Sequence, residues 1–159
     1  MNTVASNLVE LLKAQGLTCA TAESCTGGGV GSAITAVPGS SAVFTGGVIS
    51  YSNEVKRDVL GVSAESLEAH GAVSAEVAAE MAVGARRLLK TDLAVSLTGI
   101  AGPDGGSAEK PVGLVWFGLA TRDGVRTEKA IFRGDRARVR EQAVTHALGM
   151  LTIAATRPL

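Results

Sequence analysis

The sequence predicts an α/β protein, a three-layer α/β/α sandwich around a mixed five-stranded sheet that is mostly parallel with one antiparallel strand. Segments with helical spacing of apolar residues alternate with short β-rich runs through the N-terminal part of the chain. Such alternation favours parallel strands joined by right-handed crossovers. Near the C-terminus, two strand-like runs flank the turn sequence RDG, which predicts an antiparallel hairpin.

The individual elements follow from periodicity and from residues typical of helix ends. Val4, Leu8, Leu11 and Leu12 form one helical stripe, and Gly16 suits the end of that helix. Ser63, Ser74 and Asp135 are candidate N-caps of later helices. The expected helices span 3–15, 26–37, 53–62, 63–71, 74–90 and 135–155. The expected strands span 17–23, 42–52, 91–99, 114–121 and 125–133.

Length and composition indicate one globular domain over residues 1–159. Hydrophobic residues make up 46% of the chain and aromatic residues only 3%, so Ala, Val and Leu must fill the core. The chain carries 15 basic and 15 acidic residues. This balance argues against a nucleic-acid-binding surface as the main function.

The two cysteines, Cys19 and Cys25, have neither the spacing of a zinc site nor that of a disulfide framework. We therefore expect no metal and no cofactor. The N-terminus has no basic segment followed by an apolar run, and no stretch approaches the length of a membrane span. We expect a cytoplasmic protein that does not associate with membranes.

Three polar or glycine-rich segments follow predicted strands: Glu23–Gly29, Ser50–Lys56 and Thr98–Ser107. In open α/β sheets, ligands bind beyond the carboxyl ends of the strands. The three segments are therefore expected to converge on one crevice.

In the first segment, Ser24 lies between a strand and the start of a helix. Backbone N–H groups at such a position favour negative charge, and Gly27 and Gly28 allow a ligand to approach the backbone. The site could therefore bind a phosphate, or stabilise an oxyanion beside a nucleophile. Cys25 is the rival nucleophile. The simpler interpretation is that Ser24 or Thr26 only caps the helix.

A serine nucleophile needs a base, and Lys56 in the second segment is better placed than His70 or His146. Burial could lower the pKa of the Lys56 amine far enough for it to act as a base. Tyr51 could orient it. The alternatives are a solvated surface lysine and a core or interface tyrosine.

The third segment offers the Thr98 hydroxyl, with Gly99 and Gly102 opening the backbone to an anion. Alternatively, this third segment is only a flexible connection between two strands. Further along the chain, Arg136 and Arg140 are spaced i, i+4 and could hold a phosphate. Their alternative is an exposed face paired with nearby carboxylates.

Five sequence blocks resemble the CinA C-terminal domain family, which includes nicotinamide-nucleotide amidases. The likeness runs in order from about residue 3 to residue 155. The blocks are AESCTGG, GGVISYSNEVKRDVLGV, HGAVSAEVAAEMA, LTGIAGPDGG and KPVGLVWFGLA. Some members carry an additional N-terminal domain, which we do not expect in this chain.

The resemblance implies metal-independent hydrolysis of the carboxamide of nicotinamide mononucleotide to nicotinate mononucleotide and ammonia. Ser24 would be the nucleophile, Lys56 the base, Tyr51 its helper, and Thr98 part of the hydrogen-bond relay. The expected substrate and phosphate contacts are Cys25, Thr26, Gly27, Gly28, Asn53, Gly99, Gly102, Arg136 and Arg140. The resemblance also implies a homodimer or higher oligomer. The alternative is a non-catalytic nucleotide-binding or interaction module linked to competence or DNA damage.

Overall fold

A computed structural model describes residues 2–156 and contains one five-stranded mixed sheet in the order β2-β1-β3-β4-β5. β1, β2 and β3 are parallel, and β4 is antiparallel to both β3 and β5. A single strand, β4, therefore runs against the other four, which confirms the predicted sheet. The strands are β1 (Cys19–Glu23), β2 (Phe44–Ile49), β3 (Leu93–Gly99), β4 (Leu114–Thr121) and β5 (Gly124–Ile131).

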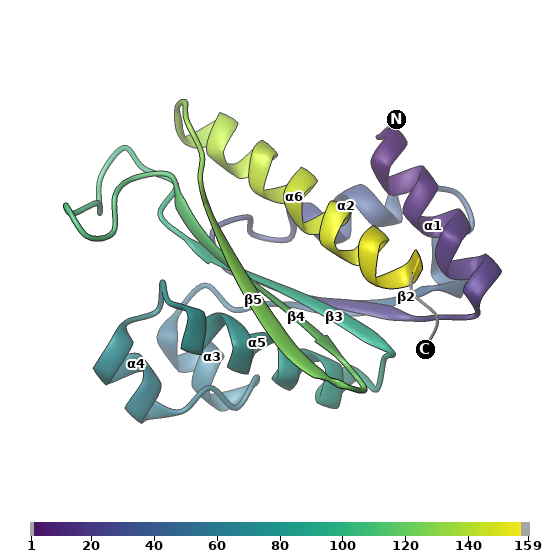
Figure 1. Cartoon of the computed structure of the whole chain (residues 1–159), viewed down its shortest axis with the longest axis horizontal. Helices are drawn as coiled ribbons and strands as arrows, with labels where there is room; N and C mark the ends of the chain where they lie inside the picture. Colours follow the sequence, from purple (N-terminus) through teal and green to yellow (C-terminus); the bar gives the residue numbers. More distant parts are fainter. Residues whose placement is uncertain (1, 157–159) are drawn as a thin grey trace.

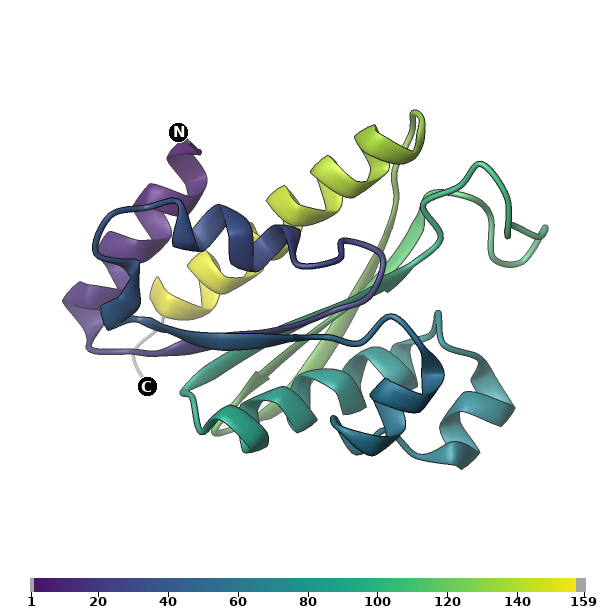
Figure 2. The ribbon, with the colours of Figure 1, turned by 180° about the vertical axis from the view of Figure 1, so that it is seen from behind.

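Helices cover both faces of the sheet (Figures 1 and 2). One layer contains α1, α2 and α6, and the other contains α3, α4 and α5. The three layers match the predicted sandwich. The helices are α1 (Thr3–Gln15), α2 (Gly29–Thr35), α3 (Asn53–Asp58), α4 (Ala64–His70), α5 (Ala75–Leu89) and α6 (Arg136–Thr156), with a 3₁₀ turn at Ser40–Ala42.

The helix ends are set by local side chains, as the sequence indicated. Ser63 and Ser74 accept hydrogen bonds from backbone N–H groups three residues later, at the starts of α4 and α5. Asp135 accepts the N–H of Arg138 at the start of α6. Gly16 adopts a left-handed conformation and ends α1. The α1 stripe is rotated slightly from the prediction, because Val4 lies at the surface.

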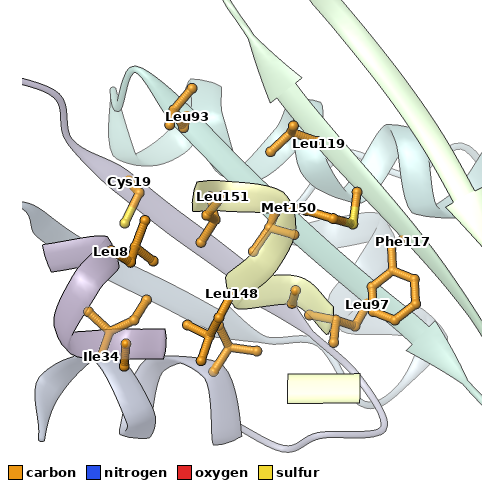
Figure 3. Packing of buried hydrophobic residues seen from close by; sticks show 14 of the residues in the cluster. Leu8, Cys19, Ile34, Leu93, Leu97, Phe117, Leu119, Leu148, Met150 and Leu151 are labelled. Carbon is orange, nitrogen blue, oxygen red and sulfur yellow. The ribbon is translucent and has the colours of Figure 1, made fainter. Parts of the chain in front are cut away.

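The core is built from small aliphatic side chains on both sides of the sheet. Between the sheet and α1, α2 and α6, one hydrophobic cluster includes Leu8, Ile34, Leu97, Phe117 and Leu148 (Figure 3). A smaller cluster around Met81 lies between α5 and the opposite face. No helix among residues 2–156 is both long enough and apolar enough to cross a membrane.

The topology brings the chain segments after β1, β2 and β3 to the same end of the sheet, since these strands are parallel. The long connection between β3 and β4 projects from that end (Figure 1). Gly113 N–H donates to the Ile100 carbonyl and closes the base of this loop. The end of the sheet thus provides the place where a site can form.

We predict that Gly84 in α5 cannot be replaced without loss of stability. A Cβ at this position would lie 1.8 Å from the Leu60 carbonyl oxygen, so the helix would have to shift. Gly84→Ala should lower the free energy of unfolding by about 1–3 kcal/mol in chemical denaturation. Gly149→Ala in α6 is the matched control, because a Cβ there meets nothing within 4 Å. It should raise stability by about 0.5–1 kcal/mol, and an equal loss in both variants would contradict the packing.

Candidate active site

A cavity of about 290 Å³ opens at the carboxyl ends of β1, β2 and β3. Its lining comes from all three predicted segments, from Ala72 and Val73 before α5, and from Arg136, the first residue of α6. The expected convergence is therefore confirmed. The polar residues that line it are Ser24, Tyr51, Asn53, Lys56, Thr98, Asp104 and Arg136.

Ser24 is fixed immediately after β1. Its backbone N–H donates to the Leu97 carbonyl at 3.0 Å, which ties the residue to the end of β3. The side chain is buried, and its Oγ lies 3.2 Å from Lys56 Nζ. The structure therefore brings together the hydroxyl and the amine that lie far apart along the chain.

Lys56 is among the largest fully buried side chains of residues 2–156, with only 1% of its surface exposed. It lies on α3, whose start is capped by the Ser52 hydroxyl. Its Nζ also contacts the carbonyl oxygens of Ser50 at 2.8 Å and Tyr51 at 3.2 Å. The interpretation of Lys56 as a solvated surface lysine is therefore wrong.

The environment of Lys56 disfavours its charged form. Within residues 2–156, no carboxylate lies within salt-bridge distance of its Nζ. Burial lowers the pKa of the Lys56 amine below its ordinary value of 10.5, and this outweighs an opposing effect of Cys25. A buried amine of this kind is suited to accept a proton.

Cys25 has the opposite character. Its side chain is buried, and burial raises the pKa of the thiol to about 11. The nucleophilic form of cysteine is the thiolate, which this environment suppresses at neutral pH. Of the two adjacent candidates, Ser24 is therefore the one with an activating neighbour.

The start of α2 is organised by Glu23, for which the sequence predicts no separate role. Gly28 is the N-cap residue and offers no side chain, so neither Ser24 nor Thr26 caps the helix as the simpler interpretation supposed. Instead, the buried Glu23 carboxylate accepts the Thr26 hydroxyl at 2.6 Å and the N–H groups of Val30 and Gly31. A carboxylate seven residues before a helical N–H has no familiar sequence signature.

Tyr51 and Thr98 line the cavity but make contacts other than those expected. Tyr51 contributes its backbone carbonyl to Lys56, while its phenol is exposed and lies 3.4 Å from Arg136 Nη2. Thr98 is buried and donates its hydroxyl to the Ala72 carbonyl at 2.8 Å. Within residues 2–156, neither hydroxyl is hydrogen-bonded to Ser24 or Lys56.

The two arginines of α6 that were predicted to hold a phosphate, Arg136 and Arg140, have separate positions. Arg136 lines the cavity and donates to the Gly102 carbonyl at 2.9 Å. Arg140 instead donates to the carbonyls of Cys25 and Thr26, both at 3.1 Å. Both arginines use backbone carbonyls rather than the nearby carboxylates that the alternative interpretation required.

The glycines shape the walls of the site. Gly27, Gly28 and Gly102 have positive φ angles of 58°, 101° and 84°. Gly99 and Gly102 line the cavity, and a Cβ at Gly99 would collide with the backbone of β4. The structure thus uses these glycines for turns and close backbone approach.

Both histidines lie outside the cavity lining. His146 stacks on Phe117 with ring centroids 4.3 Å apart, and its Nε2 lies 2.6 Å from Glu128 Oε1. His146 is therefore a packed residue of α6 that does not contribute to the cavity. His70 is the last residue of α4. Within residues 2–156, no group of three or more His, Cys, Asp or Glu residues could hold a metal ion.

Comparison with known proteins gives consistent matches over most of the chain. Nicotinamide-nucleotide amidohydrolase PncC of Escherichia coli K12 is 54% identical over 143 residues, which cover 89% of this chain and 87% of that protein. A CinA-like protein of Parasynechococcus marenigrum is 53% identical over 152 residues, or 94% of this chain. The chain spans about a third of the length of this and several other curated relatives.

Solved structures agree with these matches. The competence/damage inducible protein CihA from Agrobacterium tumefaciens superimposes with a TM-score of 0.93 at 44% identity, covering 97% of this chain and 94% of that one. A CinA superfamily protein from Klebsiella pneumoniae gives a TM-score of 0.93 at 38% identity, covering 98% of both chains. The family described as the CinA C-terminal domain matches residues 1–154, and the chain belongs to this family.

Proposed function

We propose that this protein is an amidohydrolase that converts nicotinamide mononucleotide to nicotinate mononucleotide and ammonia. The similarity to nicotinamide-nucleotide amidohydrolase PncC supports the substrate and the reaction. The contact between Ser24 Oγ and Lys56 Nζ inside the cavity supports the chemistry and is the observation that carries the proposal.

The surroundings of Lys56 favour its role as a base. A neutral lysine amine has two N–H groups and one lone pair. The carbonyls of Ser50 and Tyr51 can accept both N–H groups, which leaves the lone pair directed at the third contact, Ser24 Oγ. In this state the amine can accept the hydroxyl proton as Ser24 attacks the amide carbon.

The turn after Ser24 can supply donors for the oxyanion. Among residues 2–156, the backbone N–H groups of Cys25 and Thr26 have no oxygen acceptor, whereas the N–H groups of Val30 and Gly31 bind Glu23. We therefore place the donors in the turn rather than in α2. A well-placed donor contributes about 3 kcal/mol to stabilisation of the transition state.

The reaction then proceeds in two halves. The bond from Ser24 Oγ to the amide carbon forms as the hydroxyl proton moves to Lys56, and the carbonyl oxygen becomes an oxyanion. Collapse breaks the carbon–nitrogen bond, Lys56 returns the proton to the departing nitrogen, and ammonia leaves. Lys56 then takes a proton from water, the resulting hydroxide attacks the acyl carbon, and the bond from Ser24 Oγ to that carbon breaks as Lys56 returns the proton to Ser24. The released carboxylic acid gives its proton to the ammonia in solution, so the products are the carboxylate and ammonium.

The remaining cavity residues are proposed to hold the substrate. We propose that Arg136, an arginine of the lining, binds the phosphate together with Asn53 and the backbone at Gly99 and Gly102, which line the same cavity. We propose that Tyr51 and Thr98 form part of the cavity wall, that the Tyr51 carbonyl orients the Lys56 amine, and that Thr98 lies beside the substrate amide. Arg140 is not part of the cavity lining and instead binds the backbone carbonyls of Cys25 and Thr26, just after Ser24. We further propose that the enzyme works in the cytoplasm as a homo-oligomer, without nucleic acid.

We predict that the wild-type chain releases ammonia from nicotinamide mononucleotide in the presence of a chelator. Ser24→Ala should lower kcat at least about 1,000-fold, because it removes the nucleophile. Cys25→Ala should retain most activity, since the thiol stays protonated.

The assay is continuous detection of ammonia, with binding of nicotinate mononucleotide as the control for an intact site. Loss of turnover in Cys25→Ala but not in Ser24→Ala would assign the nucleophile to Cys25, and binding without turnover in every protein would favour a non-catalytic module.

The lowered pKa of Lys56 also predicts a pH-dependent stability. Between the folded-state pKa and 10.5, the unfolded chain binds a proton at Lys56 that the folded chain does not. The free energy of unfolding of the wild type, minus that of Lys56→Met, should therefore rise with pH across this window, by at most about 1.4 kcal/mol per pH unit. Denaturant titrations at several pH values measure this difference. A difference that is constant, or that falls as pH rises, would show that Lys56 is not destabilised as a cation.

A further inference from the structure

We propose that Glu23 is a positioning residue that holds the turn carrying Ser24 and its oxyanion donors in the reactive geometry. This inference rests on the function proposed above and adds to it a role for a buried carboxylate outside the cavity lining. The turn comprises residues Ser24–Gly28, between the end of β1 and the first residue of α2.

The Glu23 carboxylate contacts both the turn and the helix after it. One carboxylate oxygen accepts the Thr26 hydroxyl at 2.6 Å and the Val30 N–H at 2.8 Å, and the other accepts the Gly31 N–H at 3.0 Å. The side chain is 1% exposed. The carboxylate therefore links the middle of the turn to the first turn of α2 through contacts that are buried at Thr26 and Val30 and partly buried at Gly31.

The position of the charge is consistent with this role. Within residues 2–156, no cationic side chain lies within salt-bridge distance of Glu23. Its negative charge is met by backbone N–H groups at the start of α2, where the helix dipole favours an anion. Because the carboxylate occupies these donors, a substrate anion cannot use them.

Arg140 holds the same turn from another side. Its guanidinium donates to the carbonyls of Cys25 and Thr26. The N–H and C=O of a trans peptide point in opposite directions, so binding of the Cys25 carbonyl turns the Thr26 N–H away from Arg140. Ser24 is fixed separately through the Leu97 carbonyl. The Ser24 carbonyl accepts the Gly27 N–H at 3.1 Å, which fixes the peptide that carries the Cys25 N–H. With Glu23 bound to the Thr26 side chain, contacts outside the cavity set the orientation of both N–H groups that have no oxygen acceptor within residues 2–156.

The test compares Glu23→Gln with the wild type. The glutamine carbonyl oxygen can still accept hydrogen bonds from the Thr26 hydroxyl and the Val30 N–H. Its NH2 group then faces the Gly31 N–H, and two donors cannot form a hydrogen bond. We expect kcat to fall about 10- to 100-fold, as small misplacements of reacting groups do. The KM, the affinity for nicotinate mononucleotide and the far-ultraviolet circular dichroism should change little.

A second pair of variants keeps the test decisive if Glu23→Gln fails to fold. Thr26→Val removes the hydroxyl that binds Glu23, whereas Thr26→Ser keeps it. We expect kcat to fall in Thr26→Val and to be largely restored in Thr26→Ser, at similar melting temperatures. A normal kcat in both folded Glu23→Gln and Thr26→Val would overturn the proposal.

Glu80→Gln is the matched control for loss of a capping carboxylate. Glu80 accepts the Ser63 N–H at 2.8 Å next to α4 and does not line the cavity. We expect its kcat to match the wild type, and an equal loss in Glu80→Gln and Glu23→Gln would reduce the role of Glu23 to general stability.

Amide hydrogen exchange separates this inference from the proposed reaction. Peptides that contain residues 24–31 should exchange faster in Glu23→Gln than in the wild type, while peptides from α5 remain unchanged. If the wild type releases no ammonia, the proposed function fails, and exchange alone then decides whether Glu23 holds the turn. Unchanged exchange over residues 24–31 would overturn the inference.

Discussion

The burial of one lysine amine without a carboxylate partner is the constraint on which the site depends. The Lys56 side chain is buried, and its Nζ contacts two backbone carbonyl oxygens and the hydroxyl of Ser24. Placing a cation in such a position costs free energy, and the lowered pKa of Lys56 expresses that cost. The fold therefore bears a local destabilisation at the place where the proposed chemistry needs a proton acceptor.

The parallel arrangement of β1, β2 and β3 makes this contact possible. Ser24 leaves the end of β1, while Ser50, Tyr51 and Lys56 follow β2 at the same end of the sheet. The Ser50 N–H and hydroxyl both contact the Glu23 carbonyl, which fixes the two strand ends against each other. The distance between Ser24 and Lys56 is thus set by the sheet ladder and its extension, rather than by a flexible loop.

Patterns with a local cause could be predicted from the sequence, and contacts with a distant cause could not. Helix caps such as Ser74 and the hairpin turn depend on neighbouring residues, and the convergence of three segments follows from strand direction. The i, i+4 spacing of Arg136 and Arg140 correctly places them on one helix face, but it cannot show that one meets the cavity and the other the turn. Likewise, no local pattern reveals that Glu23 caps α2, or that Tyr51 contributes a carbonyl rather than its phenol to Lys56.

The most direct test of the account is the protonation state of Lys56 in the folded enzyme. Nuclear magnetic resonance of protein labelled at the lysine Cε and Nζ atoms, assigned by comparison with Lys56→Met, follows that single amine through a pH titration. We expect a midpoint below 10.5, with the neutral amine formed while the protein remains folded. A midpoint at or above 10.5 would contradict it, because the amine would then remain a cation unable to accept the Ser24 proton.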